Sequence, residues 1–261
     1  MARFLQIADD FVWLNPSLSL EVSCFGQRSA VAATRAEWPK WKPSDPTSPH
    51  WYDLERFQRL IAAYVSHDAD NGRIRTVREV VGEFRGLSGS AKGKAVLAAA
   101  GLSREPLSRL VIDGRIDPVI SGKLLEAMQE NSKPVPPALL GIIGREHFEA
   151  RFAAALCEME SFDYRKIADY DDDGIPFVIE TAFGWLGDKA EEEGRRLVTG
   201  VNWSPGIRNP FRSLGPFGMS LDSILSRQRV DADEPVIFVL HAAYPRVEYL
   251  DRGKSSVVVR S

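Results

Sequence analysis

Residues 235–243 have the sequence Pro-Val-Ile-Phe-Val-Leu-His-Ala-Ala, the most continuously apolar strand-like stretch of the chain. A run of this length and composition predicts a strand buried on both faces. Residues 175–185 and 195–203 also predict strands, and residues 220–228 between the second and third strands predict a short helix. Strands separated by helices indicate a small α/β domain with a mixed sheet over residues 134–261. With a helical segment before it, the chain is expected to be of the α+β or α/β class.

The middle of the chain predicts a helical domain over residues 53–133. Apolar side chains between positions 54 and 65 fall on one helical face, and Thr76 with Glu79 forms a capping box. Gly- and Ser-rich turns separate the short helices of this segment. Further helices are expected over residues 90–100, 103–111 and 117–130, and one more beyond this domain over 144–156.

The first 34 residues predict a helix over 3–13, a strand over 17–25 and a returning strand over 28–34. Because the stability of a two-stranded ribbon is marginal by itself, we expect this segment to be the end of a larger sheet.

Residues 35–52 form a connector between these segments. They hold four prolines and three tryptophans, a proline density that excludes a regular helix or strand. The tryptophans are expected to pack against neighbouring domains. An aromatic platform for nucleic-acid bases is the alternative interpretation.

Composition narrows the class of protein. Hydrophobic residues make up 44% and charged residues 26%, as in ordinary globular proteins. The chain has no apolar run of membrane length and no charged-then-apolar leader, so we expect a cytoplasmic protein without membrane partners.

Cys24 and Cys157 lie far apart, which favours a reduced compartment. The four histidines have no metal-ligand spacing, so no metal site is predicted, and His241 is expected to be a hydrogen-bonded core residue.

Positive charge is concentrated in one segment. Residues 72–133 contain eleven Lys or Arg and seven Asp or Glu, a net charge of +4, although the whole chain has a net charge of −3. A basic segment in an acidic protein can contact a phosphate backbone, through residues such as Arg85, Lys92, Lys94 and Arg104. A solvated helical surface is the alternative.

Gly253-Lys254-Ser255 follows the apolar strand and invites comparison with a phosphate-binding loop. A Walker-type loop needs another glycine five residues before the Gly-Lys pair, where this chain has Glu248, so that class of nucleotide site is excluded. A lysine at a loop tip can still reach a phosphate across a domain boundary. An exposed turn lysine is the other interpretation, and local sequence leaves both open.

Six stretches follow one another in a characteristic order, at residues 14–20, 43–51, 141–146, 175–185, 198–205 and 236–254. In this order they resemble the B subunit of DNA topoisomerase VI, a type IIB enzyme, and its bacterial relatives. Residues 141–146 are similar to the family's Ser-Pro-Ile-Gly-Glu turn without its Ser-Pro, and residues 175–185 to its Pro-Phe-x-Val-Glu strand. The last match gives Lys254 the role of the family's switch lysine.

The resemblance implies a domain order and a mechanism. In the family, an ATPase domain of the gyrase and histidine-kinase type precedes a helix-two-turns-helix domain and a transducer. The switch lysine reaches the γ-phosphate of bound ATP, and the transducer passes the resulting motion to an A-type subunit whose tyrosine cleaves DNA. Residues 1–34 would then be the remnant of the ATPase sheet, 53–133 the helix-two-turns-helix domain and 134–261 the transducer.

The resemblance also implies partners and cofactors. The expected partners are DNA, an A-type subunit, the missing ATPase segment and a second copy of the complete subunit. The family's Asp-x-Gly-x-Gly motif is absent, since Asp173-Gly174 is followed by Ile-Pro. ATP and Mg²⁺ are therefore expected only when a complete ATPase domain is present, and the C-terminal transducer helix is expected to be missing. A non-catalytic DNA- or protein-binding module and an inactive remnant are the alternative functions.

Overall fold

The computed structural model describes residues 2–187, 194–214, 218–250 and 256–257. They divide into a sheet unit, formed by residues 1–41 and 137–261, and a helical unit, formed by residues 42–136. In the described part of the chain, seven α-helices accompany a five-stranded mixed sheet, which is the α+β class that the sequence predicts. No helix in these ranges combines the length and the apolarity needed to cross a bilayer.

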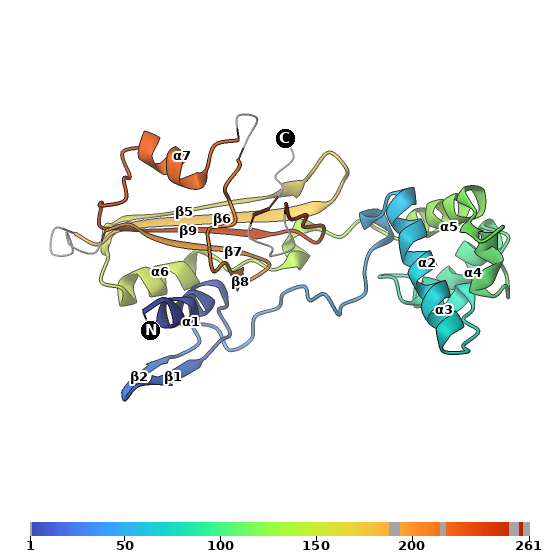
Figure 1. Cartoon of the computed structure of the whole chain (residues 1–261), viewed down its shortest axis with the longest axis horizontal. Coiled ribbons are helices and arrows are strands. Elements are labelled where there is room, and N and C mark those ends of the chain that lie inside the picture. The colour runs from blue at the N-terminus through green and yellow to red at the C-terminus, as the bar shows by residue number, and fades with distance from the viewer. Residues whose placement is uncertain (1, 188–193, 215–217, 251–255, 258–261) are drawn as a thin grey trace. The chain divides into compact units, whose positions relative to one another are not determined.

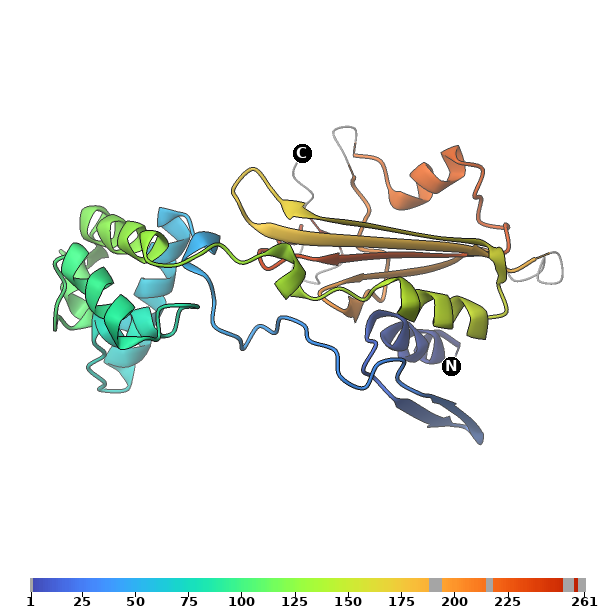
Figure 2. The ribbon, with the colours of Figure 1, turned by 180° about the vertical axis from the view of Figure 1, so that it is seen from behind.

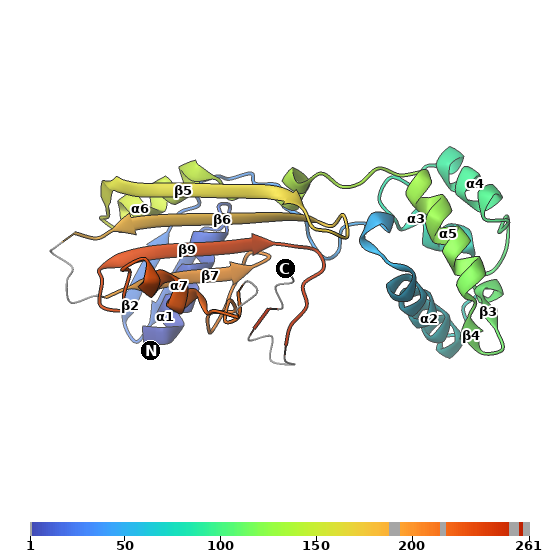
Figure 3. The ribbon, with the colours of Figure 1, turned by 90° about the horizontal axis from the view of Figure 1, so that it is seen from above.

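The sheet has the strand order β5-β6-β9-β7-β8 (Figure 3). Strand β6 runs antiparallel to both β5 and β9, β7 runs parallel to β9, and β8 pairs antiparallel with β7. The strands are β5 (Glu158–Tyr170), β6 (Pro176–Trp185), β7 (Arg196–Val201), β8 (Ser204–Pro205) and β9 (Val236–Ala243). Helix α7 (Leu221–Arg227) lies in the connection between the parallel strands β7 and β9. The central strand β9 is buried along most of its length, as its apolar sequence predicts.

Helices cover both faces of the sheet. Figure 1 and, from behind, Figure 2 show α1 (Ala2–Leu14) and α6 (Arg145–Ala154) on one face and α7 on the other. The contact on the first face is close, because a Cβ at Gly184 of β6 would collide with the ring of Phe152 in α6. On the second face, Leu221 and Leu225 of α7 pack with Leu240 of β9.

The N-terminal segment belongs to the sheet unit. Helix α1 packs against β7 and β8, and β1 (Leu20–Cys24) and β2 (Gln27–Val31) pair as a separate two-stranded sheet. The sequence places a domain boundary after residue 34, whereas the contacts group residues 1–41 with the C-terminal segment.

The helical unit has its own hydrophobic core, which includes the fully buried residues Phe57, Phe84 and Met128. Its helices are α2 (Leu54–Asp70), α3 (Val77–Gly82), α4 (Ser90–Ala99) and α5 (Pro118–Glu130). The capping box predicted at Thr76 and Glu79 is present at the start of α3, and Asp117 caps α5 as expected. Short 3₁₀ turns occur at η1 (Pro49–Trp51), η2 (Leu107–Leu110) and, in the sheet unit, η3 (Pro137–Leu140).

Two expectations about local structure are wrong. Residues 103–111 do not form the expected α-helix. They contain η2, which Pro106 precedes, and end where a small hairpin of β3 (Val111–Ile112) and β4 (Arg115–Ile116) begins. Strand β5 is not predicted at all, because it is an edge strand with ten exposed side chains among 13, six of them charged.

Candidate functional site

The predicted switch lysine, Lys254, lies outside the described residues. The residues on each side of its loop are described, and Leu250 N–H donates to Ser256 O at 2.9 Å. Tyr249 forms an antiparallel bridge with Val257, whose N–H donates to Pro210 O at 3.0 Å. The two ends of the loop therefore lie side by side in the sheet unit.

The four basic residues predicted to face DNA are all exposed and lie on or beside α4 in the helical unit. Arg85 is in the turn between α3 and α4, Lys92 and Lys94 are on α4, and Arg104 follows the helix. Arg104 has a φ of 66°, in the left-handed region, so its turn is sharply bent.

Lys92 and Lys94 do not lie on the same face of α4. Two positions along a helix correspond to about 200° of rotation, and the buried Gly93 lies between them. The lysines therefore flank the buried face of the helix on opposite sides, which the charge count from sequence does not reveal.

Most of the positive charge of this segment is available to solvent. Of the eleven Lys and Arg residues at positions 72–133, only Arg75 is buried. Throughout residues 42–136, every one of which is described, no ion pair joins Arg85, Lys92, Lys94 or Arg104 to a carboxylate. The helical unit as a whole carries fourteen Lys or Arg against twelve Asp or Glu, a net charge of +2, so its basic character is local to the region around α4.

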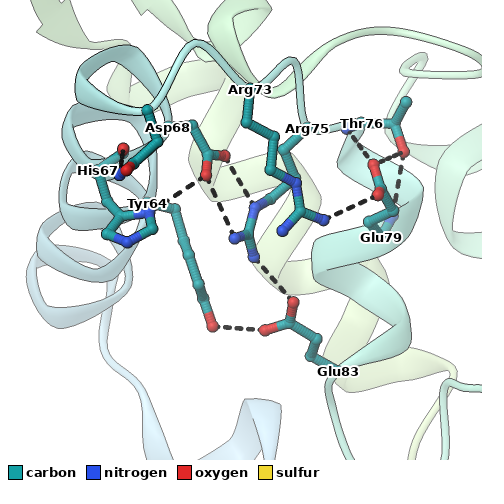
Figure 4. Close-up of polar contacts among 9 residues, drawn as sticks. Tyr64, His67, Asp68, Arg73, Arg75, Thr76, Glu79 and Glu83 are labelled. Carbon is teal, nitrogen blue, oxygen red and sulfur yellow. Dashed lines mark hydrogen bonds and ion pairs between the residues drawn. The ribbon is translucent and has the colours of Figure 1, made fainter.

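Arg75 instead forms ion pairs within the helical unit (Figure 4). Its guanidinium pairs with both oxygens of Asp68 at 2.8 and 3.3 Å, and with Glu83 at 2.8 Å. The same guanidinium lies 4.3 Å from the ring centroid of Tyr64, whose hydroxyl donates to Glu83 at 2.5 Å. Since Asp68 and Tyr64 are on α2 and Glu83 ends α3, Arg75 ties these helices together.

Two members of this network have shifted pKa values. Arg75 lowers the pKa of Asp68 by hydrogen bonding to its carboxylate. Burial together with Glu83 raises the pKa of Tyr64 to about 12, so the phenol remains a hydrogen-bond donor at neutral pH. The buried Asp68 carboxylate is therefore charged beside Arg75 at neutral pH.

A second polar cluster lies in the core of the sheet unit, around the fully buried Glu180 of β6. Its carboxylate accepts hydrogen bonds from the backbone N–H groups of Ile143 (2.9 Å) and Gly144 (2.8 Å) and from the hydroxyl of Tyr164 (2.8 Å). Burial alone would raise the pKa of Glu180, but His241 and the two backbone donors outweigh it and lower the pKa.

Residues from three of the six stretches that carry the family resemblance lie at this carboxylate, and a fourth stretch is linked to it through His241. Glu180 belongs to one, and its partners Ile143 and Gly144 belong to another. His241, with Nδ1 3.7 Å from Glu180, belongs to a third. Trp203, whose N–H donates to His241 Nε2 at 3.2 Å, belongs to a fourth. His241 is thus the hydrogen-bonded core histidine that its position in an apolar strand predicts.

The connector reaches the same cluster. Trp38 Nε1 donates to Ile142 O at 2.7 Å, and its ring stacks edge-on against Trp203 with centroids 5.8 Å apart. Lys40 Nζ lies 5.2 Å from each of these two rings and donates to Asn15 at 2.7 Å. Trp38 and Trp51 are buried, which favours packing over a base-stacking platform for these two side chains.

Comparisons with known proteins add no assignment: no protein-family model matches the chain, and no curated protein matches its sequence. In the described ranges, no group of three or more His, Cys, Asp or Glu side chains is arranged to hold a metal ion.

Proposed function

We propose that this chain is the helical and transducer part of a type IIB DNA topoisomerase B-like subunit, and that its helical unit contacts the DNA backbone. The observation that carries the proposal is the set of exposed basic side chains around α4, none of which is paired with a carboxylate within residues 42–136. An unpaired surface cation gains energy from a phosphate chiefly by releasing condensed counterions. A contact of this kind is independent of base sequence.

The sheet unit supports the second part of the proposal. The stretches that resemble the family are dispersed over more than 200 positions, yet four of them are joined around Glu180. A rigid polar core of this kind suits a domain that passes motion from one partner to another. The contact of Lys254 with the γ-phosphate of ATP rests on the resemblance alone, as do the A-type subunit, the dimerisation and Mg²⁺.

DNA binding is tested with the full chain and a fluorescent duplex, by anisotropy at increasing salt. The test variant replaces Arg85, Lys92, Lys94 and Arg104 with Gln. The matched control replaces Lys42, Arg78, Lys123 and Lys133 with Gln. These residues of the same unit are also exposed and form no ion pair within residues 42–136, so both variants lose four charges.

We expect the test variant to bind the duplex more weakly than the unaltered chain. The slope of the logarithm of the association constant against the logarithm of the salt concentration should become shallower by up to about 3.6 in this variant, and should change much less in the control. Equal effects of the two variants would show that α4 is not the contact. No binding of the unaltered chain at low salt would remove the DNA-contact proposal altogether.

The nucleotide role is tested separately, in a subunit that joins this chain to its ATPase segment. Lys254→Ala is expected to lower ATP turnover, because it removes a charge-assisted contact with the γ-phosphate. Arg229→Ala, an exposed residue of the same unit, serves as the control. Unchanged turnover together with normal DNA binding would favour the non-catalytic DNA-binding module.

A further inference from the structure

A cavity of about 430 Å³ opens at the edge of the sheet where the parallel strands β7 and β9 end. In open α/β sheets, ligands bind preferentially at the carboxyl ends of the parallel strands. The cavity lies within the sheet unit, on the face of the sheet that α7 covers, whereas the basic residues around α4 belong to the helical unit.

A small residue in the central strand explains the hollow at the floor of the cavity. Ile179 of β6, Ala242 of β9 and Val201 of β7 are directly opposite one another across three neighbouring strands. The middle residue of this row has only a methyl group, so a hollow remains between two larger side chains. Phe211 and Val257 form apolar walls, and the lining is therefore mostly hydrophobic.

The rim is acidic. Asp171, Asp172, Asp173 and Glu248 contribute four carboxylates and Arg246 one guanidinium, a net formal charge of −3. Such a rim repels an anion and attracts a cation, and the field is strengthened by the low-dielectric wall beside it.

The rim is also held in place. The carboxylate of Asp171 accepts hydrogen bonds from the backbone N–H groups of Asp173 (3.0 Å) and Ile175 (2.8 Å) and from the hydroxyl of Tyr244 (2.5 Å). Arg246 pairs with Asp173 at 2.6 Å. Asp172 is exposed, and within the described residues no hydrogen bond or ion pair occupies its carboxylate. The residues on each side of Asp172 are thus fixed, which reduces the backbone entropy lost on binding.

We propose that this cavity binds a small organic ammonium compound, with its apolar body on Ile179, Ala242 and Val201 and its positive head at Asp172. An apolar pocket with a few convergent polar groups is the usual form of a small-molecule site, and 430 Å³ is within the range of such sites. The proposal does not depend on DNA binding or on the role of Lys254.

The test uses the full chain and isothermal titration with three probes of similar size: 2-phenylethylamine, neutral 2-phenylethanol and anionic phenylacetate. We expect the amine to bind about tenfold more tightly than the alcohol, and the anion most weakly. Equal affinity for the amine and the alcohol, or no binding of the amine, would overturn the proposal.

Two variants locate the binding. Ala242→Leu fills the hollow and is expected to abolish binding of the amine, and Asp172→Asn should weaken it about three- to tenfold. The control, Asp113→Asn, removes a charge from an exposed turn of the helical unit and should change nothing. If Ala242→Leu fails to fold, the exposed Asp172→Asn decides the outcome, and an unchanged affinity in that variant contradicts the site. Tighter binding of a capped lysine peptide than of the free amine would assign the cavity to a protein partner instead.

Discussion

Nδ1 of His241 lies 3.7 Å from Oε2 of Glu180, and both side chains are fully buried. Because Nε2 of the ring accepts a hydrogen bond from Trp203 N–H, we assign the ring proton to Nδ1, on the side of the carboxylate. At 3.7 Å this contact is too long for a hydrogen bond, and it acts as an electrostatic one. The strand pair β6–β9 and the turn after β7 are thereby coupled through one buried acidic group.

Glu180→Gln is expected to destabilise the sheet unit by about 3 kcal/mol, because the amide cannot accept hydrogen bonds from both Ile143 N–H and Gly144 N–H in place of a carboxylate. Urea unfolding followed by tryptophan fluorescence measures the change, since five of the six tryptophans lie in the sheet unit. Glu160→Gln, at an exposed position on β5, is the control and should change stability by less than about 0.5 kcal/mol. A loss below about 1 kcal/mol for Glu180→Gln would mean that the carboxylate is not needed to hold the turn before α6.

His147 makes the sheet unit sensitive to mild acid. Burial lowers the pKa of His147 from 6.5 to about 4, so its ring is neutral in the folded state, where it bonds Trp13 O and Thr34 Oγ1. Between these two pH values the unfolded chain binds a proton that the folded chain does not. The free energy of unfolding is therefore complete above pH 6.5 and falls as the pH drops, by up to about 3 kcal/mol near pH 4.

His147→Gln tests this sign, because it keeps a hydrogen-bond donor but has no proton to gain. The free energy of unfolding, measured at intervals from pH 7 to 5, should fall less steeply in this variant than in the unaltered chain. This window lies above the region where Glu180 and Asp68, whose pKa values are lowered, begin to lose their contribution. Ser226→Ala, at an exposed position of α7 in the same unit, is the control, because it neither removes nor adds a titratable group. Equal slopes for the unaltered chain and His147→Gln would exclude this histidine as the source.

Local patterns in the sequence predict much of the fold. The capping box at Thr76 and Glu79, the Asp117-Pro118 helix start and the apolar strand that includes His241 all depend on neighbouring residues, and each is found as predicted. Strand β5 escapes prediction because ten of its 13 side chains are exposed. Phe162 and Tyr164, which pack against α6, give too short an apolar alternation to mark a strand.

The polar clusters escape prediction for a different reason. Glu180 lies 37 positions from Ile143 and 16 from Tyr164, and Arg75 resembles ten other basic residues of its segment. Only the packed structure shows that Arg75 is internal whereas Arg85 is exposed. An acidic residue seven positions before Arg75 is the one local signal, and it is common in any charged helix–turn.

Arg75 is expected to be a structural residue of the helical unit. Arg75→Met leaves the buried Asp68 with only His67 beside it and should loosen α2 and α3, whereas Arg75→Lys should do so less because it keeps the charge. Hydrogen exchange of peptides covering residues 60–85 measures the effect. Asp68→Asn combined with Arg75→Met should recover part of the lost protection, since no unpaired buried charge then remains. If the double variant lost as much protection from exchange as the two single variants together, the pairing of Arg75 with Asp68 would be contradicted.

The contact between α6 and the sheet depends on the absence of a side chain at Gly184. A Cβ there would lie 2.8 Å from Cε1 of Phe152 and closer still to Cδ1. The ring cannot move away, because it is fully buried and packs against Trp13 and Phe162, each with centroids 5.1 Å distant. Gly184→Ala is therefore expected to destabilise the sheet unit by about 1–3 kcal/mol.

The comparison for this variant is Gly82→Ala, because a Cβ at that position of α3 meets no atom within 4 Å. In a helix the added methyl group should be neutral or stabilise by up to about 1 kcal/mol. Thermal unfolding of the two variants should thus give changes of opposite sign. If the unfolding temperature of Gly184→Ala were no lower than that of the unaltered chain, α6 would have to lie farther from β6 than the Phe152 contact requires. The backbone turn at Ile143 and Gly144, which leads directly into α6, could then not be held against Glu180 as described.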